Sequence, residues 1–318
     1  MALILHYEEL SLDLIQSNPL IVIHGGAGPQ DPSGKQIEKA KTSIQAILRR
    51  LRTNGSIPAY AVKGSLSIQK CLQGAWELEE DPAFNAGYGA ALQADGVARV
   101  SASFMESTHQ KFSAVMNCEQ VMHPSALAFA LQDETHCILD QRGAERLARQ
   151  LGIEPQELTT DERLTKWMEH KKKSLPTKPS TGKTGTIGSV CLSLDPTPKL
   201  AVCTSTGGVG NETPGRVGDT PTIAGNYCDN LTAISCTGIG EQIINHSFAS
   251  RVAIRIQDGS GLRESLSRSL KEVQKKGDQL AAIAVSIDFS KNTAYWAVGA
   301  TTPSMIWGAL TPQQMLVF

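Results

Sequence analysis

A threonine at the end of a long polar segment is a candidate nucleophile. Residues 161–185 are rich in lysine and poor in apolar residues, and strand-like alternation resumes at Thr186. This composition predicts a flexible linker that ends where a strand begins. A threonine hydroxyl needs an adjacent base, and an α-amine, with a reference pKa of about 8, can serve. Thr186 has a free amine only if the bond after Gly185 is cut.

Several glycine-rich motifs surround this threonine along the chain. They are HGGAG at 24–28, FNAGYG at 84–89, GTIGSV at 185–190, TSTGG at 204–208, PGRVGD at 214–219 and TGIGE at 237–241. In this order the set resembles the plant-type L-asparaginase and isoaspartyl aminopeptidase family of threonine N-terminal-nucleophile hydrolases, over roughly residues 20–260. The resemblance implies hydrolysis of L-asparagine and of N-terminal β-aspartyl residues in dipeptides.

The resemblance also implies how the chain is processed and assembled. Autocleavage between Gly185 and Thr186 would give an α chain, 1–185, and a β chain, 186–318, which together form one composite domain. The expected functional unit is a dimer of such αβ pairs.

Roles for the reacting groups follow from the same resemblance. Thr186 is expected to be the nucleophile and its own base, and Thr206 to hydrogen-bond and tune it. Asn85 matches an asparagine near the nucleophile. Thr237 and Gly238 match an oxyanion hole made of a hydroxyl and a backbone N–H, which are aimed at the charge that develops on the attacked carbonyl.

A second group of residues is expected to hold the substrate. By the resemblance, Arg216 grips the α-carboxylate, because a planar guanidinium binds a carboxylate in a bidentate fork that lysine cannot match. Asp219 accepts the α-ammonium. The full expected binding set is Arg216, Val217, Gly218, Asp219, Thr237, Gly238, Ile239 and Gly240.

The chemistry implied by the resemblance needs no cofactor. The segment from Leu78 to Tyr88 resembles a loop that holds a structural sodium ion, and carbonyl oxygens suit a hard cation. The main-chain oxygens implied are those of Leu78, Glu79, Asp81, Phe84, Ala86 and Tyr88. A helix end followed by a tight turn explains the same residues without an ion.

The apolar pattern predicts the elements that position these residues. Strands are expected at 20–24, twice within 96–118, and at 186–194, 200–206, 231–236, 280–288 and 293–299. Helices are expected at 35–52, about 59–80, twice within 124–151, and at 241–257 and about 261–276. Strands that cluster in two groups with helices on both sides indicate an α/β protein, here a four-layer αββα sandwich.

Bulk composition narrows the class of protein. The 318 residues carry 30 basic and 31 acidic side chains, a net charge of −1 that gives no electrostatic reason to expect nucleic acid or a membrane surface as partner. The expected partner is a small-molecule substrate. The amino-terminal residues do not resemble a secretory signal, and the seven cysteines form no CxxC pair. These features favour a cytoplasmic protein with cysteines in its core.

Other functions stay open at this stage. A glycosylasparaginase-like amidase would use the same chemistry, although Gly185 and the TGIG motif favour the asparaginase side. An uncleaved, inactive scaffold is a second alternative, because Met105-Glu106-Ser107 and the stretch from about Lys275 to Phe318 depart from the family pattern. A dinucleotide-binding protein is disfavoured, since HGGAG does not continue into GxGxxG. His24 is interpreted as a core or loop histidine.

Overall fold

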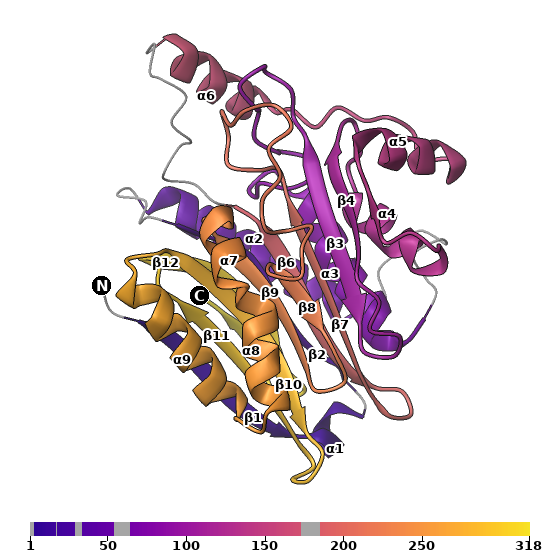
Figure 1. The fold of residues 1–318 in the computed structure, drawn as a ribbon, viewed down its shortest axis with the longest axis vertical. Helices are drawn as coiled ribbons and strands as arrows, with labels where there is room; N and C mark the ends of the chain where they lie inside the picture. The colour runs from indigo at the N-terminus through magenta and orange to yellow at the C-terminus, as the bar shows by residue number, and fades with distance from the viewer. Residues whose placement is uncertain (1–2, 17, 29–33, 54–63, 173–184) are drawn as a thin grey trace.

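Two β-sheets form the centre of the molecule (Figure 1). The computed structural model describes residues 3–16, 18–28, 34–53, 64–172 and 185–318. One sheet has the order β1-β11-β10-β9-β8, and the other has the order β13-β12-β2-β6-β7-β3-β4-β5. Neighbouring strands are antiparallel except β4 and β5, which are parallel.

The chain passes between the two sheets three times, after β1, β7 and β11. The smaller sheet contains β1 (Ile4–Ser11), β8 (Asn226–Cys228), β9 (Thr232–Gly238), β10 (Leu280–Asp288) and β11 (Thr293–Ala300). The larger contains β2 (Leu20–Gly28), β3 (Val100–Glu106), β4 (Ser113–Cys118), β5 (Ile138–Leu139), β6 (Ile187–Leu194), β7 (Pro198–Thr206), β12 (Ser304–Leu310) and β13 (Met315–Val317).

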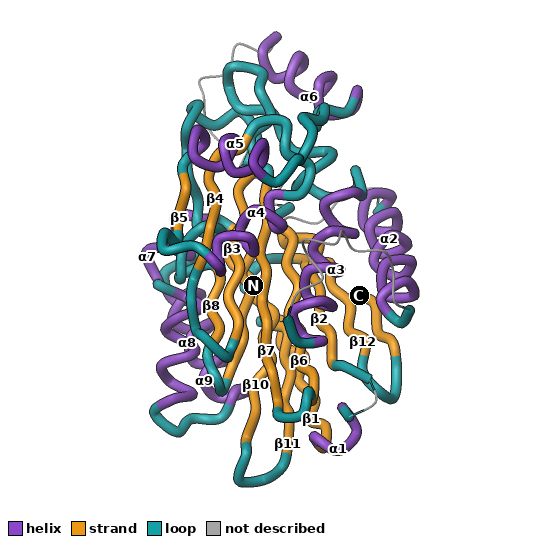
Figure 2. The backbone as a smooth tube through the Cα atoms, turned by 90° about the vertical axis from the view of Figure 1, so that its right-hand side faces the viewer, coloured by secondary structure: helices purple, strands orange, loops and turns teal. Residues whose placement is uncertain are grey.

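Helices cover the outer face of each sheet (Figure 2). The larger sheet packs against α2 (Lys35–Leu51), α3 (Leu66–Glu80), α4 (Pro124–Ala130) and α5 (Gln141–Gln150). The smaller sheet packs against α8 (Phe248–Gln257) and α9 (Leu262–Lys275), with α7 (Gly240–His246) at the end of β9. A separate apolar cluster that includes Val22, Val190 and Trp296 fills the space between the sheets. These layers confirm the predicted αββα sandwich.

The central strands are buried on both faces, and this explains their sequences. β6 is buried along all but its last residue, and β9 along its whole length. A strand covered on both sides reads as a nearly continuous run of apolar and small residues. Most of the predicted strands and helices are confirmed. The strand that follows Thr186 and the strands that contain Thr206 and Thr237 therefore lie in the buried interior.

The ends of the chain differ from expectation. Strands β1, β12 and β13 have no counterpart among the predicted elements. β1 pairs only with β11, so it lies at a sheet edge, and its residues are mostly half-buried. The helix expected over 241–257 is broken at Ser247, which has φ +45° and separates α7 from α8. Residues 59–63 of the helix expected from 59 lie outside the described residues; α3 begins at Leu66.

The linker prediction for 161–185 is wrong over 161–172, which form helix α6 (Asp161–Lys172). None of its residues is buried, so the composition resembles that of a linker. Thr160 Oγ1 accepts the Arg163 N–H at 3.2 Å and caps the helix start, and acidic residues in the first turn and basic ones in the last suit the helix dipole. Residues 173–184 lie outside the described part of the chain.

Long-range hydrogen bonds hold α6 against the body of the protein. Arg163 donates from Nε to the Gly89 carbonyl at 2.6 Å and from Nη2 to the Phe84 carbonyl at 3.0 Å. Trp167 Nε1 donates to the Gln93 carbonyl at 3.0 Å. A lone pair on each main-chain oxygen is thus satisfied by a side chain that is far away in sequence, which composition cannot reveal.

Candidate active site

The candidate nucleophile lies at the amino end of β6, in the larger sheet. Thr186 directly precedes this strand and is buried, with 6% of its surface exposed. Its Oγ1 donates to Thr206 Oγ1 at 3.0 Å, and Thr206 Oγ1 also accepts the Gly208 N–H at 3.1 Å. Thr206 ends β7 and Thr186 directly precedes β6, and these strands are antiparallel with Ile187 opposite Ser205, so the sheet fixes the separation of the two threonines.

Asn85 joins the segment before the nucleophile to the turn after Thr206. Its backbone N–H donates to the Gly185 carbonyl at 3.3 Å, and its carbonyl accepts the Gly207 N–H at 2.8 Å. Its side-chain Nδ2 donates to the Gly208 carbonyl at 2.7 Å, and Oδ1 accepts the Ala91 N–H at 2.7 Å. Both backbone groups and both ends of the amide are therefore used, which holds Asn85 in one orientation.

Glycine is required on two sides of Asn85 because the chains approach closely. A Cβ on Gly185 would lie 2.6 Å from the Asn85 Cβ. A Cβ on Gly207 would lie 2.6 Å from Asn85 Oδ1 and from the Ala90 Cβ. The glycine before the candidate cleavage point therefore admits Asn85 beside the bond that is expected to break.

The predicted oxyanion residues end β9, in the smaller sheet. Thr237 is fully buried, and within the described residues its Oγ1 has no hydrogen-bond partner. Gly238 has φ +134°, a conformation that favours glycine, and a Cβ there would lie 2.6 Å from the Leu280 Cα. Ile239 and Gly240 then lead into α7. A free hydroxyl beside a turned backbone can supply donors to a developing oxyanion.

Three contacts tie β9 and the loop of residues 207–225 to each other and to the larger sheet. Ser235 Oγ on β9 lies 2.7 Å from Thr204 Oγ1 on β7. Ser103 Oγ on β3 donates to the Thr220 carbonyl at 2.5 Å, and the Cys236 N–H donates to the Gly225 carbonyl at 2.8 Å. The loop that contains Arg216 and Asp219 is thereby tied to both sheets.

The predicted substrate-binding charges converge at Gly240. A Cβ on Gly240 would lie 2.9 Å from both Arg216 Nη2 and Asp219 Oδ1, and a Cβ on Gly218 would lie 3.0 Å from Arg216 Nη1. Glycine at these positions leaves room for a positive and a negative group side by side. Val217 lies between them in sequence, in the same turn. The structure thus brings together the residues that the PGRVGD and TGIG motifs supply.

Asp219 is buried and has an unusual proton affinity. Burial raises the pKa of Asp219 to about 7, although the nearby Arg216 guanidinium opposes this and favours the charged form; Glu241 adds to the rise. Its Oδ2 has no hydrogen-bond partner among the described residues. A buried carboxylate without a full set of partners is well suited to accept an ammonium group.

Glu241 is a site residue that the sequence did not identify. Its carboxylate receives a bidentate pair of hydrogen bonds from Arg216 Nε and Nη2, both at 2.9 Å. Glu241 is the second residue of α7, and an acidic residue in a first helical turn has an ordinary structural explanation. The only signal in the sequence was its position directly after the TGIG motif, and the structure places its carboxylate beside Arg216.

His24 lies in the core beside the nucleophile strand, as the sequence indicated. It is fully buried, and its Nε2 lies 2.9 Å from Ser235 Oγ. Burial lowers the pKa of His24 to about 3, with a backbone contact to Thr186 opposing the shift. A ring with so low a pKa is a poor base at neutral pH, so this histidine does not compete with an α-amine for the role.

The loop from Leu78 to Tyr88 was predicted to hold sodium through main-chain oxygens. Glu79 O accepts the Tyr88 N–H at 2.8 Å, Asp81 O accepts the Phe84 N–H at 3.1 Å, and Phe84 O accepts Arg163. Each carbonyl retains a second lone pair. Side chains suggest no metal centre here: among the described residues, no three His, Cys, Asp or Glu side chains are grouped to hold an ion.

The helices and the cysteines bear on the class of protein predicted from composition. In the described part of the chain, no helix has both the length and the apolar character needed to cross a membrane. Six of the seven cysteines are buried, and all seven are free thiols; Cys137 is exposed. This confirms that most of the cysteines are core residues.

Similarity to known proteins extends over most of the chain. The sequence profile described as asparaginase matches residues 17–317, and so includes the carboxy-terminal stretch that seemed divergent. A relative from Synechocystis sp. is 36% identical over 91% of this chain and 86% of its own length. Relatives from Nostoc sp. (36% identical, covering 85% and 86%) and Bos taurus (34%, covering 92% and 93%) also match. All three are named isoaspartyl peptidase/L-asparaginase, and the chain belongs to the asparaginase family.

Proposed function

We propose that this chain cuts itself between Gly185 and Thr186 and then hydrolyses L-asparagine and β-aspartyl dipeptides. Thr186 Oγ1 attacks the Gly185 carbonyl carbon, the bond to the Thr186 nitrogen breaks, and that nitrogen takes up the hydroxyl proton. Water then hydrolyses the resulting ester and leaves a carboxylate on Gly185. The Asn85 N–H that contacts the Gly185 carbonyl at 3.3 Å supports this route, because a donor there polarises the carbonyl under attack.

The arrangement of strands lets the two chains stay together after the cut. The β6–β7 hairpin follows the cleavage point, yet β6 pairs with β2 and β7 pairs with β3, which both precede it. The α chain, 1–185, and the β chain, 186–318, therefore share one sheet and form one composite domain. Burial between the layers holds them without the covalent bond.

The freed α-amine of Thr186 then serves as the base for hydrolysis. It takes the Oγ1 proton as the oxygen attacks the substrate's side-chain carbonyl, and it returns the proton to the departing ammonia or peptide amine. Thr206 orients the hydroxyl through the 3.0 Å hydrogen bond, which is the observation that carries this proposal. Thr237 Oγ1 and the Gly238 N–H stabilise the oxyanion, and water hydrolyses the acyl-enzyme to release aspartate.

The substrate's α-carboxylate and α-ammonium bind beside Arg216 and Asp219, which together form the carboxylate end of the site. Arg216 forks onto the carboxylate after releasing Glu241, and Asp219 accepts the ammonium. The backbone of Val217, Gly218, Ile239 and Gly240 lines this end, where glycine leaves room for the ligand. A free amino-acid end is thereby favoured over the interior of a polypeptide.

Assembly and ion binding complete the proposal. We infer a dimer of αβ pairs from the family resemblance. A sodium ion would be structural, held by second lone pairs on main-chain oxygens of the Leu78–Tyr88 loop, and it would take no part in bond breaking. The crowding of the Glu79 and Met122 carbonyls around Gly87, where a Cβ would clash with both, fits an oxygen-rich turn of this kind.

Mass spectrometry of the intact purified protein tests processing. We expect two chains, the smaller one beginning Thr-Ile-Gly-Ser, and hydrolysis of both L-asparagine and a β-aspartyl dipeptide. Thr186→Ala should remain full length and inactive, while Thr186→Ser should retain some activity because it keeps hydroxyl and amine. A wild-type protein that is active but uncut contradicts the proposal. An uncut, inactive wild type supports the scaffold alternative, and a preference for sugar-linked asparagine supports the glycosylasparaginase-like one.

A further inference from the structure

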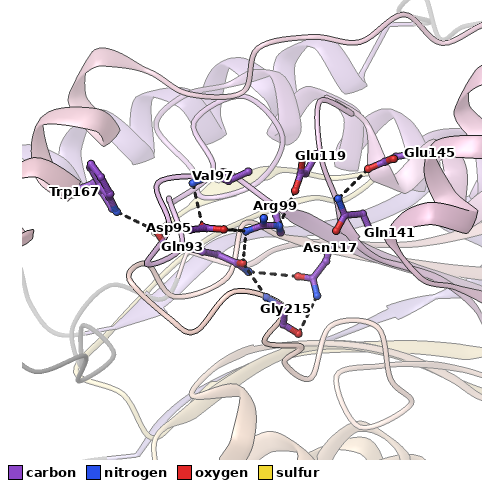
Figure 3. Close-up of polar contacts among 10 residues, drawn as sticks. All are labelled: Gln93, Asp95, Val97, Arg99, Asn117, Glu119, Gln141, Glu145, Trp167 and Gly215. Atoms are coloured by element: carbon purple, nitrogen blue, oxygen red, sulfur yellow. Dashed lines mark hydrogen bonds and ion pairs between the residues drawn. The ribbon is translucent and has the colours of Figure 1, made fainter.

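We propose that Gln93 and Asn117 are positioning residues for Arg216, and that they set the affinity of the site for the substrate's α-carboxylate. The inference rests on the proposed role of Arg216. It concerns the residue before the arginine, Gly215, whose two backbone groups are both held by side chains from the amino-terminal part of the chain (Figure 3).

Both backbone groups of Gly215 form hydrogen bonds with side chains. Its N–H donates to Gln93 Oε1 at 3.1 Å, and its carbonyl accepts Asn117 Nδ2 at 3.1 Å. The two amides also meet each other, with Gln93 Nε2 3.5 Å from Asn117 Oδ1. Gly215 has φ +85°, so the turn needs glycine, and the two amides fix the direction in which the chain leaves it.

The hydrogen bonds that Arg216 itself forms lie within the turn or near the surface. Residues 207–225 contain no helix or strand. The Arg216 N–H donates to the Thr213 carbonyl at 3.0 Å, which is a contact within the turn itself. The guanidinium meets Glu241, whose side chain is 59% exposed. The amide pair of buried Gln93 and half-buried Asn117 therefore links the residue next to Arg216 to the amino-terminal part of the chain.

A charged frame holds the amide pair in place. Arg99 Nη1 donates to Gln93 Oε1 at 2.8 Å, so two donors meet at this oxygen and fix the orientation of the amide. Arg99 is in turn paired with Asp95 at 2.9 Å and with Glu119 at 2.8 Å. Trp167 on α6 donates to the Gln93 carbonyl (Figure 3). Gln93 is 1% exposed, so water does not readily replace these partners.

The frame and the arginine belong to different chains after cleavage. Gln93 and Asn117 lie in the α chain, and Gly215 and Arg216 lie in the β chain. The α chain thus contributes to the carboxylate end of the site without contacting the substrate. Loss of this grip should let the guanidinium move, which weakens binding but leaves the nucleophile unaffected.

Two variants test the hydrogen bonds that Gln93 and Asn117 form with Gly215, and one matched control accompanies them. Gln93→Met keeps the length of the side chain and removes the acceptor. Asn117→Asp keeps the size and the tolerance for φ +52°, but points an oxygen at the Gly215 carbonyl. Each should raise the KM for L-asparagine about five- to tenfold, the effect of losing one hydrogen bond, and change kcat less than about twofold. Gln141→Met removes a nearby amide that bonds Glu145 and should change neither constant.

A double-mutant cycle with Arg216→Ala separates positioning from general destabilisation. In that background, Asn117→Asp should change kcat/KM less than about twofold, because there is no guanidinium left to position. Equal effects in both backgrounds, or an unchanged KM for both correctly processed single variants, overturn the inference. A wild-type KM for Arg216→Ala alone overturns the proposed carboxylate clamp instead, so the two failures are distinguishable.

Discussion

The two ends of the candidate site are built in different ways. At the nucleophile end, Thr186 is hydrogen-bonded to Thr206, and Asn85 is hydrogen-bonded to the residues just before Thr186 and just after Thr206. All three residues are buried. At the carboxylate end, where the substrate's α-carboxylate is proposed to bind, Arg216 is paired with Glu241, whose side chain is exposed. At the first end the side chains already have their partners in the uncut chain and only the α-amine has to be freed, whereas the second end must exchange a partner when the substrate arrives.

This difference has a consequence for kinetics. Groups that are already oriented stabilise the transition state at no further cost, so changes at the nucleophile end should lower kcat. Groups that exchange partners act mainly in binding, so changes at the carboxylate end should alter KM. The following variants test whether the two ends separate in this manner.

The largest effect should come from Thr206→Val. The variant keeps the shape of the side chain but removes the oxygen that meets Thr186 Oγ1 and accepts the Gly208 N–H. We expect kcat for L-asparagine to fall about 100-fold or more, with little change in KM, since an oriented active-site hydrogen bond has an effect of that order. Thr206→Ser keeps the hydroxyl and should lose much less. A Thr206→Val enzyme with altered KM and unchanged kcat contradicts the proposed division.

Arg216→Ala should follow, with a loss of about 30-fold or more in kcat/KM for L-asparagine, mostly through KM. Removing one partner of a desolvated charge pair costs roughly 2–5 kcal/mol, and about 1.4 kcal/mol corresponds to tenfold. The matched probe is 3-aminopropanamide, which lacks the α-carboxylate and whose hydrolysis should be affected far less. Similar losses on both compounds would show that Arg216 acts on the fold.

Sequence patterns predicted the nucleophile end better than the carboxylate end for a physical reason. Thr186 directly precedes β6 and Thr206 ends β7, strands whose alternation is visible locally, and antiparallel pairing brings the two residues together. Glu241 meets Arg216 only because α7 begins where β9 ends, and an acidic residue at a helix start looks ordinary. Helix α6 was missed for a similar reason, because Arg163 and Trp167 bind main-chain oxygens about 74 to 79 residues earlier.

The pH dependence should also divide between the two ends. Burial raises the pKa of Asp219 to about 7, and in its proposed role Asp219 binds the ammonium only when ionised, so the KM for L-asparagine should fall as pH rises through about 7. In the proposed mechanism the Thr186 amine must be neutral to act as a base. The kcat should therefore rise as pH increases through the pKa of that amine, whose reference value is about 8. Measuring both constants from pH 5.5 to 9 (roughly spanning the two groups) tests this.

Succinamate provides the control for this profile, because it is asparagine without the α-ammonium. Its KM should not improve as Asp219 ionises, since a carboxylate offers nothing to a substrate that lacks the positive charge. Arg216→Ala should move the KM transition for L-asparagine to higher pH, because the guanidinium favours the charged form of Asp219. A KM that is flat across neutral pH means that Asp219 does not bind the ammonium.

The smallest effect is expected from Glu241→Gln, and it tests partner exchange directly. In the proposed binding mode the substrate's carboxylate displaces Glu241 from Arg216, and a partly exposed ion pair contributes up to about 1 kcal/mol, or roughly fivefold. A glutamine competes less well, so KM for L-asparagine should fall about two- to fivefold while kcat stays nearly constant. The gain should shrink at high salt, which already weakens the original pair. Glu264→Gln removes the same charge from the first turn of α9 and serves as the control. If Glu241→Gln instead raises KM, Glu241 holds the guanidinium in its binding position, and the carboxylate end is then as preorganised as the nucleophile end.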